Sequence, residues 1–410
     1  MTNLIRKYKL IVCLLRITNA QKAKNSTSSE ILVPGMIQKF WQQVSIKDYS
    51  IAAKIAAAYK PIPQLERTVL DQLKIDSLQF LAYASVGIVY KGNIGGQTHA
   101  IKVKHPGIDK ILTKDMQFLR RITQLISFWL PLEIKKHLYS IIDEASREIM
   151  EESDYSKETA NHKSFHNTQL DEEIIIPVLN QKYCSENMIV SEYSSGQTLA
   201  SFLSSGEPAD KRWFLDTYHR FILNNLLHYG KLHADPHPNN FLVETDRNGQ
   251  KRLVVLDFGC VIDYSTEFIT ALNELLMEAS ATTINDEKLL DLLGKLGFDS
   301  NSLQYYRPVI PWLVRVILEP YIEDRDMIYS DWNIDYKIST ILSSRVWERP
   351  LSFSSDLLFL FRVYNALISY WRQSNIPINW YQSIKTIWGG FETDEKKQSL
   401  PVEDNTFNGS

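Results

Sequence analysis

One stretch of the chain, residues 229–263, constrains the fold more than any other, because it joins a rigid polar loop to a hairpin. Pro236 and Pro238 lack backbone donors and fix their own φ, so the segment 233–240 is predicted to be a loop and not a helix. Two short apolar runs follow, 241–243 and 253–256, and the polar segment 245–251 between them is typical of a turn. The sequence therefore predicts a fixed loop followed by a β-hairpin.

Three oxygen-bearing side chains occupy defined places in this unit. Asp235 and Asn240 lie in the loop, and Asp257 follows the second apolar run in an Asp-Phe-Gly tripeptide. The spacing fits H-x-D-x-x-x-x-N followed by D-F-G, which is typical of phosphoryl transfer. Mg²⁺ prefers oxygen ligands, so we expect Asn240 and Asp257 to hold Mg²⁺ together with the phosphates of ATP. Asp235 would then orient or deprotonate the acceptor.

The same loop permits a zinc interpretation, which we consider weaker. His233 and His237 have the spacing H-x-x-x-H, which could bind zinc from one face of a helix. Pro236 disfavours that helix, and no glutamate lies between the two histidines. The phosphoryl-transfer interpretation is therefore the stronger one.

An earlier strand supplies a candidate phosphate-binding lysine. Ala100-Ile101-Lys102-Val103 matches the V-A-I-K strand whose lysine reaches the α- and β-phosphates. The preceding segment 80–92 also reads as strand, and the small residues Ser85 and Gly87 would let its backbone approach phosphates. The alternative is an exposed strand lysine.

A kinase-like site also needs a helix carboxylate that pairs with this lysine. The segment 138–170 is helical by its periodicity, and Glu144, Glu148 and Glu152 repeat along one side of it. A solvated charged stripe is the ordinary interpretation of such a repeat. Spacing alone does not decide which glutamate would pair with Lys102.

Two further apolar runs, 173–179 and 188–193, are predicted strands. The second leads into Ser194-Ser195-Gly196, a candidate hinge between two lobes. The backbone from Glu192 through Tyr193 to Ser194 would meet an adenine edge there.

The segment from His233 to Asn240 resembles the HADPHPGN loop of the UbiB (AarF-type) family of atypical protein-kinase-like proteins, with Asn239 where the family has Gly. Aminoglycoside-phosphotransferase-like kinases carry a related loop. The segment around 82–89 is similar to the family's alanine-rich loop A-A-A-S-I-G-Q-V. The resemblance implies nucleotide contacts from these residues: Ala84, Ser85, Gly87 and Val89.

Two more segments carry the resemblance. Residues 152–161 are similar to the family's E-x-D-Y-x-x-E-A-x-N, which implies that Glu158 is the partner of Lys102 and that Glu152 belongs to the site. Residues 39–42 are similar to the K-x-G-Q motif of a helix that covers the active site in that family, with Trp41 in place of Gly. The resemblance implies that Glu152 and Asp154 face this helix.

The fold expected from these segments is α+β, a two-lobed protein-kinase-like fold with a helical N-terminal extension. The expected parts are a basic N-terminal segment and linker at 1–30, the helical extension at 31–75, an N-lobe at 76–193, a helical C-lobe at 194–391 and a polar tail at 392–410. Expected C-lobe helices are 208–229, 265–279, 286–296, 302–322, 334–345 and 355–373, with five tryptophans as core candidates, namely Trp312, Trp347, Trp371, Trp380 and Trp388.

Composition excludes some partners and compartments. A net charge of −3 offers no overall basic field for nucleic acid, and three cysteines without metal spacing indicate a reducing compartment. No uncharged apolar run reaches the roughly 18 residues of a membrane span. The N-terminus is basic, lacks acids before Glu30 and becomes serine-rich, which is typical of a transit peptide but also of an ordinary basic tail. We expect a mitochondrial protein, peripheral at a membrane, with a cytoplasmic location as the alternative.

Three functions are consistent with these features. The first is Mg²⁺-ATP-dependent phosphoryl transfer or ATP hydrolysis, which the resemblance links to ubiquinone or prenyl-lipid metabolism and its proteins. The second is a pseudokinase or scaffold that binds nucleotide as a switch. The third is a small-molecule kinase, which rests on the loop shared with aminoglycoside phosphotransferases.

Overall fold

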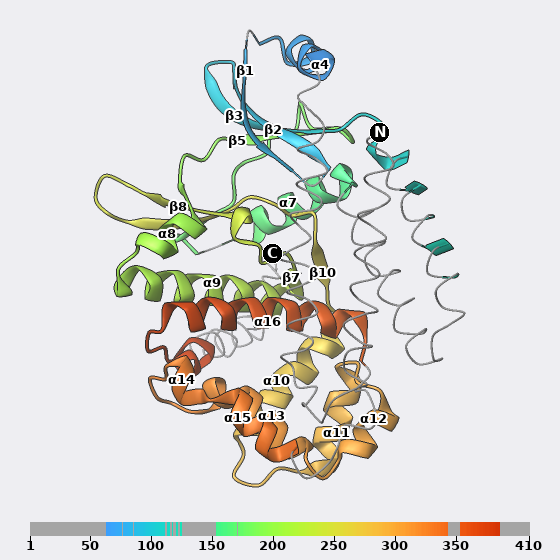
Figure 1. The fold of residues 1–410 in the computed structure, drawn as a ribbon, viewed down its shortest axis with the longest axis vertical. Coiled ribbons are helices and arrows are strands. Elements are labelled where there is room, and N and C mark those ends of the chain that lie inside the picture. The colour runs from blue at the N-terminus through green and yellow to red at the C-terminus, as the bar shows by residue number, and fades with distance from the viewer. Residues whose placement is uncertain are drawn as a thin grey trace, which may run out of the picture.

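The computed structural model describes residues 63–385, except 76, 85, 170, 125–152, 343–352 and four pairs of positions between 111 and 123. The part of the expected helical extension before residue 63, the K-x-G-Q-like segment, the basic N-terminus, the tail, Ser85 and Glu152 lie outside the described residues. The described chain forms a small lobe built on a sheet and a larger helical lobe below it (Figure 1).

The small lobe is built on four antiparallel strands in the order β1-β2-β3-β5. The strands are β1 (Leu78–Tyr83), β2 (Gly87–Ile94), β3 (Gln97–Lys104) and β5 (Met188–Glu192). Helix α4 (Pro63–Leu73) packs its Val69 and Leu73 against the apolar face of this sheet. The helix that the sequence assigned to the N-terminal extension therefore contributes to the core of the small lobe.

Helix α7 (Tyr155–Thr168) lies between the sheet and the helical lobe (Figure 1). The Asp154 carboxylate accepts hydrogen bonds from the backbone N–H groups of Ser156 and Lys157, at 3.1 and 3.0 Å, and so caps the first turn. The prediction of one continuous helix over 138–170 is wrong at 153–154, because these two residues are not helical and α7 begins only after the Asp154 cap. At the described positions of 108–124 the chain is helical.

A second four-stranded sheet, ordered β4-β9-β8-β6, lies below the first lobe. It comprises β4 (Ile174–Ile175), β6 (Gln197–Thr198), β8 (Phe241–Thr245) and β9 (Lys251–Val255). The predicted hairpin is confirmed, since β8 and β9 pair antiparallel from Phe241–Val255 to Thr245–Lys251. The predicted strand 173–179 is reduced to two residues in β4. A separate antiparallel pair joins β7 (Lys231–His233) to β10 (Val261–Asp263), and the polar loop and the hairpin lie between these two strands in the sequence.

Helix α9 (Pro208–Tyr229) is the long helix under this sheet, and it delivers the chain to the polar loop. It begins with a capping box between Glu207 and Asp210 and ends at Gly230, whose φ is 63°. A Cβ at Gly230 would lie 2.8 Å from the Tyr264 carbonyl oxygen. Glycine is therefore required where the chain turns into β7.

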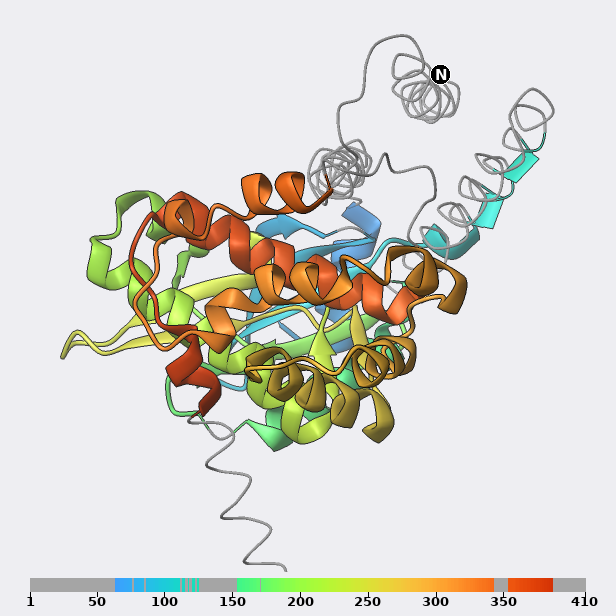
Figure 2. The same cartoon turned by 90° about the horizontal axis from the view of Figure 1, so that it is seen from below.

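The remaining helices surround one large apolar core that extends from α9 to the C-terminal helix. They are α8 (Leu199–Ser205), α10 (Thr266–Ser280), α11 (Asp286–Lys295), α12 (Ser300–Tyr306), α13 (Ile310–Ile322), α14 (Tyr329–Trp332), α15 (Ile334–Leu342) and α16 (Ser355–Ser374). Helix α16 lies against α9 and crosses the face of the lobe seen from below (Figure 2).

Two predictions about this lobe are wrong. The single helix expected at 302–322 is interrupted between α12 and α13, where Pro308 lacks the N–H that a continuous helix would use for its hydrogen bond. Trp312 is 62% exposed and so is no core residue, whereas Trp371 and Trp380 are buried as expected. Trp347 and Trp388 lie outside the described residues. No helix in the described part of the chain is both long and apolar enough to cross a membrane.

Candidate active site

Lys102 is the point at which the two lobes meet. It lies on β3, between Val89 of β2 and Ile189 of β5. Its Nζ donates to both Glu158 carboxylate oxygens, at 2.7 and 2.9 Å, and to Asp257 Oδ2 at 2.9 Å. The structure thus pairs Lys102 with Glu158 on α7 and joins both to the Asp-Phe-Gly segment.

The three charged groups of this cluster shift one another's pKa values. Burial lowers the pKa of Lys102, but the carboxylates of Asp257 and Glu158 together hold this pKa well above its usual value. Burial and the Asp257 charge raise the pKa of Glu158 to about 7, although Lys102 opposes the rise. Burial also opposes the charge on Asp257, yet Lys102 and the Gly259 N–H keep its pKa below the usual range. Burial thus opposes the charge on all three groups, and their mutual attraction opposes that effect.

The Asp-Phe-Gly segment is fixed from three sides. Asp257 follows β9, where the Leu256 N–H donates to the Asn240 carbonyl oxygen at 2.9 Å. Asp257 Oδ1 accepts from the Gly259 N–H at 2.9 Å. Phe258 is fully buried, and Asn161 of α7 donates through Nδ2 to its carbonyl oxygen at 3.1 Å. The metal candidates Asn240 and Asp257 are thus neighbours at the end of the hairpin.

Aromatic packing locks Phe258 between α7 and the polar loop. Its ring centroid lies 4.6 Å from that of His162, 5.2 Å from that of Phe165 and 5.4 Å from that of His233. His233 Nε2 donates to the Asp257 carbonyl oxygen. Burial lowers the pKa of His162 to about 4, partly opposed by its hydrogen bond to the Pro177 carbonyl. Both histidines are therefore packing and hydrogen-bonding groups of this core.

The polar loop presents Asp235 with a defined orientation. Asn240 Nδ2 donates to Asp235 Oδ2 at 2.6 Å and to the Asp235 carbonyl oxygen at 3.2 Å. Arg362 Nη2 of α16 donates to Asp235 Oδ1 at 3.2 Å. Tyr370, also on α16, donates its hydroxyl to the Pro236 carbonyl oxygen at 2.8 Å. The C-terminal helix thus supports the loop directly.

The residues predicted to bind the nucleotide lie above this cluster. Val89 is the cross-strand partner of Lys102, so the two side chains share one face of the sheet. The Ala84 N–H donates to the Gly87 carbonyl oxygen at 3.0 Å. A Cβ at Gly87 would lie 2.3 Å from the Val103 carbonyl oxygen and 2.5 Å from the Tyr155 hydroxyl. Close packing on Tyr155, which the sequence did not reveal, explains the need for glycine here.

At the hinge, two backbone donors are already used. The Glu192 N–H donates to the Val178 carbonyl oxygen at 2.9 Å, and the Tyr193 N–H donates to the Thr98 carbonyl oxygen at 3.2 Å. Lys91 Nζ lies 4.1 Å from the centre of the Tyr193 ring. The expected adenine contacts of this segment would therefore not come from these two N–H groups.

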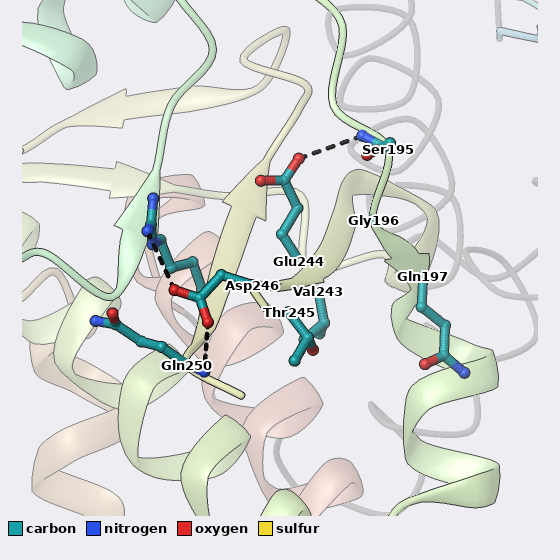
Figure 3. A pocket seen from close by; sticks show the side chains of 9 residues that line it. Ser195, Gly196, Gln197, Val243, Glu244, Thr245, Asp246 and Gln250 are labelled. Atoms are coloured by element: carbon teal, nitrogen blue, oxygen red, sulfur yellow. Dashed lines mark hydrogen bonds and ion pairs between the residues drawn. The ribbon is translucent and has the colours of Figure 1, made fainter. Parts of the chain in front are cut away.

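Behind the hinge, the structure has a polar pocket of about 350 Å³ that sequence reasoning missed (Figure 3). Its walls are the segment 195–197 and the β8–β9 hairpin. Glu244 points toward the hinge and accepts from the Ser195 N–H at 3.2 Å, while Asp246 accepts from the Gln250 N–H at 2.9 Å (Figure 3). Lys102 and Asp257 do not line this pocket, so it is separate from the charged cluster.

The oxygen donors of the cluster suit magnesium better than a transition metal. The described residues contain no group of three or more His, Cys, Asp or Glu side chains that could hold a metal by themselves. Mg²⁺ needs fewer protein ligands, since it keeps waters and takes substrate phosphates. One carboxylate from Asp257 and one amide oxygen from Asn240 fit that requirement.

The sequence analysis assigned no role to Asn161, His162 and Arg362, which the structure places at this site. Arg362 could have been noticed, because it is the one charged residue in the mostly apolar run from Leu357 to Trp371. A buried cation in such a helix needs an acidic partner. Nothing in the sequence indicated which acid this would be.

The two lobes, the lysine–glutamate pair and the ordered polar loop define a two-lobed, protein-kinase-like protein. The family model of the ABC1 atypical kinase-like domain matches residues 67–291, which is more than half of the chain, so the chain belongs to this family. The resemblance to UbiB (AarF-type) proteins is thereby confirmed, and with it the kinase-like fold.

Named relatives agree with this assignment. The chain is 31% identical over 193 residues to the Arabidopsis thaliana protein Activity of bc1 complex kinase 3, chloroplastic. This match covers 46% of this chain and 26% of that protein. It is 29% identical over 208 residues to an uncharacterized aarF domain-containing protein kinase, chloroplastic, of the same plant, covering 50% of this chain and 28% of that protein. The chain thus spans about a quarter of the length of these relatives. Their names say chloroplastic, so they lend no support to a mitochondrial location.

A solved structure shares the fold. The Mycobacterium tuberculosis protein Rv3197, in a complex with erythromycin, superposes with a TM-score of 0.59 at 18% sequence identity. The match covers 92% of this chain and 97% of that one. The likeness therefore extends over the helical lobe beyond the segment that the family model matches.

Proposed function

We propose that this atypical kinase-like protein binds Mg²⁺-ATP and transfers its γ-phosphoryl group to a hydroxyl acceptor or to water. The observation that carries the proposal is the convergence of Lys102, Glu158 and Asp257 within hydrogen-bonding distance, although Lys102 and Asp257 are 155 positions apart in the sequence. Such a cluster is what positioning of a triphosphate requires.

Each polar residue has a distinct role in this proposal. Lys102 would bind the phosphates, and Glu158 would hold Lys102 in place. Asn240 and Asp257 would hold Mg²⁺, which neutralises charge on the phosphates. Asp235 would take the proton of the acceptor while the acceptor oxygen bonds to the γ-phosphorus and ADP departs. The family resemblance supports an acceptor in ubiquinone or prenyl-lipid metabolism at a membrane surface.

Phosphate release from ATP, measured with lipid vesicles or detergent present, tests this function. We expect release by the parent protein and a loss of about 100-fold or more in Asp235→Asn, because general acid–base catalysis contributes about 10²- to 10⁴-fold. Equal release by both proteins would contradict the role of Asp235. Nucleotide binding without release or transfer to any acceptor would instead favour a nucleotide-binding pseudokinase.

A further inference from the structure

Arg362 reaches the polar loop from a part of the chain that the family model does not match. That match ends at residue 291, whereas Arg362 lies on α16. Its Nη2 is 3.2 Å from Asp235 Oδ1, and the two side chains are only 11% and 13% exposed. A buried ion pair therefore connects the last long helix to the candidate base.

The pair completes the hydrogen bonding of the Asp235 carboxylate. Oδ2 accepts from Asn240, and Oδ1 accepts from Arg362. Tyr370 lies eight positions after Arg362, close to the same face of α16, and binds the backbone of the same loop. Helix α16 therefore contacts the loop at two points, of which only Arg362 touches the carboxylate.

Electrostatics in this part of the site also depend on Arg362. Burial lowers the pKa of His237, the charge of Asp235 raises it, and the charge of Arg362 lowers it further. Arg362 thus compensates the charge of Asp235 and disfavours a second cation at His237. A methionine of similar volume would provide the packing of this helix without either effect.

We propose that Arg362 is a positioning residue, which holds the Asp235 carboxylate in the orientation that receives the acceptor's proton. The inference rests on the proposed phosphoryl transfer and adds a required residue from outside the matched domain. Loss of Arg362 should therefore slow turnover and leave the affinity for ATP nearly unchanged, because Lys102, Asn240 and Asp257 bind the nucleotide without it.

A double-mutant cycle on the full chain tests this inference, with ATP hydrolysis or transfer as the readout. We expect Arg362→Met to lower kcat about 100-fold, as a misplaced catalytic group does, with KM for ATP within about twofold of the parent value. In an Asp235→Asn background, Arg362→Met should cause no further loss, because residues that act as one unit are not additive. Arg362→Lys, which keeps the charge, should recover part of the rate.

Arg372→Met is the matched control. Arg372 is on the same helix, where its guanidinium lies 5.6 Å from the centre of the Tyr329 ring. We expect parent activity from this variant. Thermal unfolding shows which variants are folded, and Arg362→Lys decides the case if Arg362→Met does not fold, since it should then keep more activity than Asp235→Asn.

The outcomes separate the two proposals. Full activity of Arg362→Met, or an equal fold-loss with and without Asp235, would overturn the positioning role while phosphoryl transfer stands. No turnover by the parent protein with any acceptor would overturn the proposed function, and the inference with it. A rise in KM with kcat unchanged would assign Arg362 to substrate binding instead and would also overturn it.

Discussion

Lys102→Met should destabilise the protein because it leaves two carboxylates facing each other without their cation. Glu158 is 4% exposed and is bound to Lys102 by two hydrogen bonds, and Asp257 by one. Removal of one partner from a buried ion pair costs about 3–5 kcal/mol. At roughly 2–4 °C per kcal/mol, the unfolding midpoint should fall by about 6–20 °C.

The stability lost in Lys102→Met should also depend on pH. Burial and the charge of Asp257 raise the pKa of Glu158 in the folded protein to about 7. Lys102 acts in the opposite direction, so Lys102→Met should raise this pKa further. A carboxyl whose pKa is higher folded than unfolded stabilises the fold at low pH and loses that contribution as pH rises through the folded value. Lys102→Met should therefore be less stable at pH 8 than at pH 6, by at most about 1.4 kcal/mol per pH unit.

Thermal and urea unfolding at pH 6 and pH 8 measure both effects. Lys104→Met is the matched control, because Lys104 lies two positions along the same strand and pairs at 3.4 Å with Asp109, which is 54% exposed. The Lys104 side chain is 9% exposed, but its partner remains in contact with solvent, so its loss leaves no buried carboxylate without a cation. If Lys102→Met unfolds like the parent protein, or becomes more stable as pH rises, the charged cluster has been misassigned.

Three further predictions concern the surrounding fold. Burial, aided by Arg220, lowers the pKa of His219 to about 3, so the unfolded chain binds a proton that the folded protein excludes below pH 6.5. The free energy of unfolding measured in urea should therefore decrease as pH falls from 6.5 to 5, and His219→Phe should reduce this dependence on pH. An unchanged dependence on pH in His219→Phe would contradict the role of His219. Gly230→Ala should lower the free energy of unfolding by about 1–3 kcal/mol or more. The loss should exceed that of Gly249→Ala, because the φ of Gly249 is also positive, at 82°, but a Cβ there would have no atom within 4 Å. Equal unfolding midpoints would contradict the steric argument. Asn161→Ala removes the donor to the Phe258 carbonyl and should weaken Mg²⁺-ATP binding by about 1 kcal/mol, or roughly fivefold, in calorimetry. Unweakened binding would show that this hydrogen bond is not needed.

Local signals explain what the sequence predicted well. The prolines around Asp235, the turn residues between β8 and β9 and the lysine strand each act over a few neighbouring residues, and each is found where it was predicted. The break at Pro308 follows the same local rules, but the prediction of one helix over 302–322 did not take this proline into account.

Tertiary contacts explain what the sequence did not reveal. Asn161 and Phe258 are 97 positions apart, and Arg362 is 127 positions from Asp235. No periodicity or spacing specifies such pairs. The pairing of Lys102 with Glu158 came from a family resemblance, because several glutamates of the preceding segment satisfied the helical spacing equally well.

The most direct test of the site is the position of the metal in a crystal grown with Mn²⁺ and a non-hydrolysable ATP analogue. We predict an anomalous peak bound by Asn240 and Asp257, with phosphate oxygens completing its ligands and Lys102 on the phosphates. A nucleotide seated in the pocket behind Ser195, or a metal bound away from Asp257, would contradict the site described above.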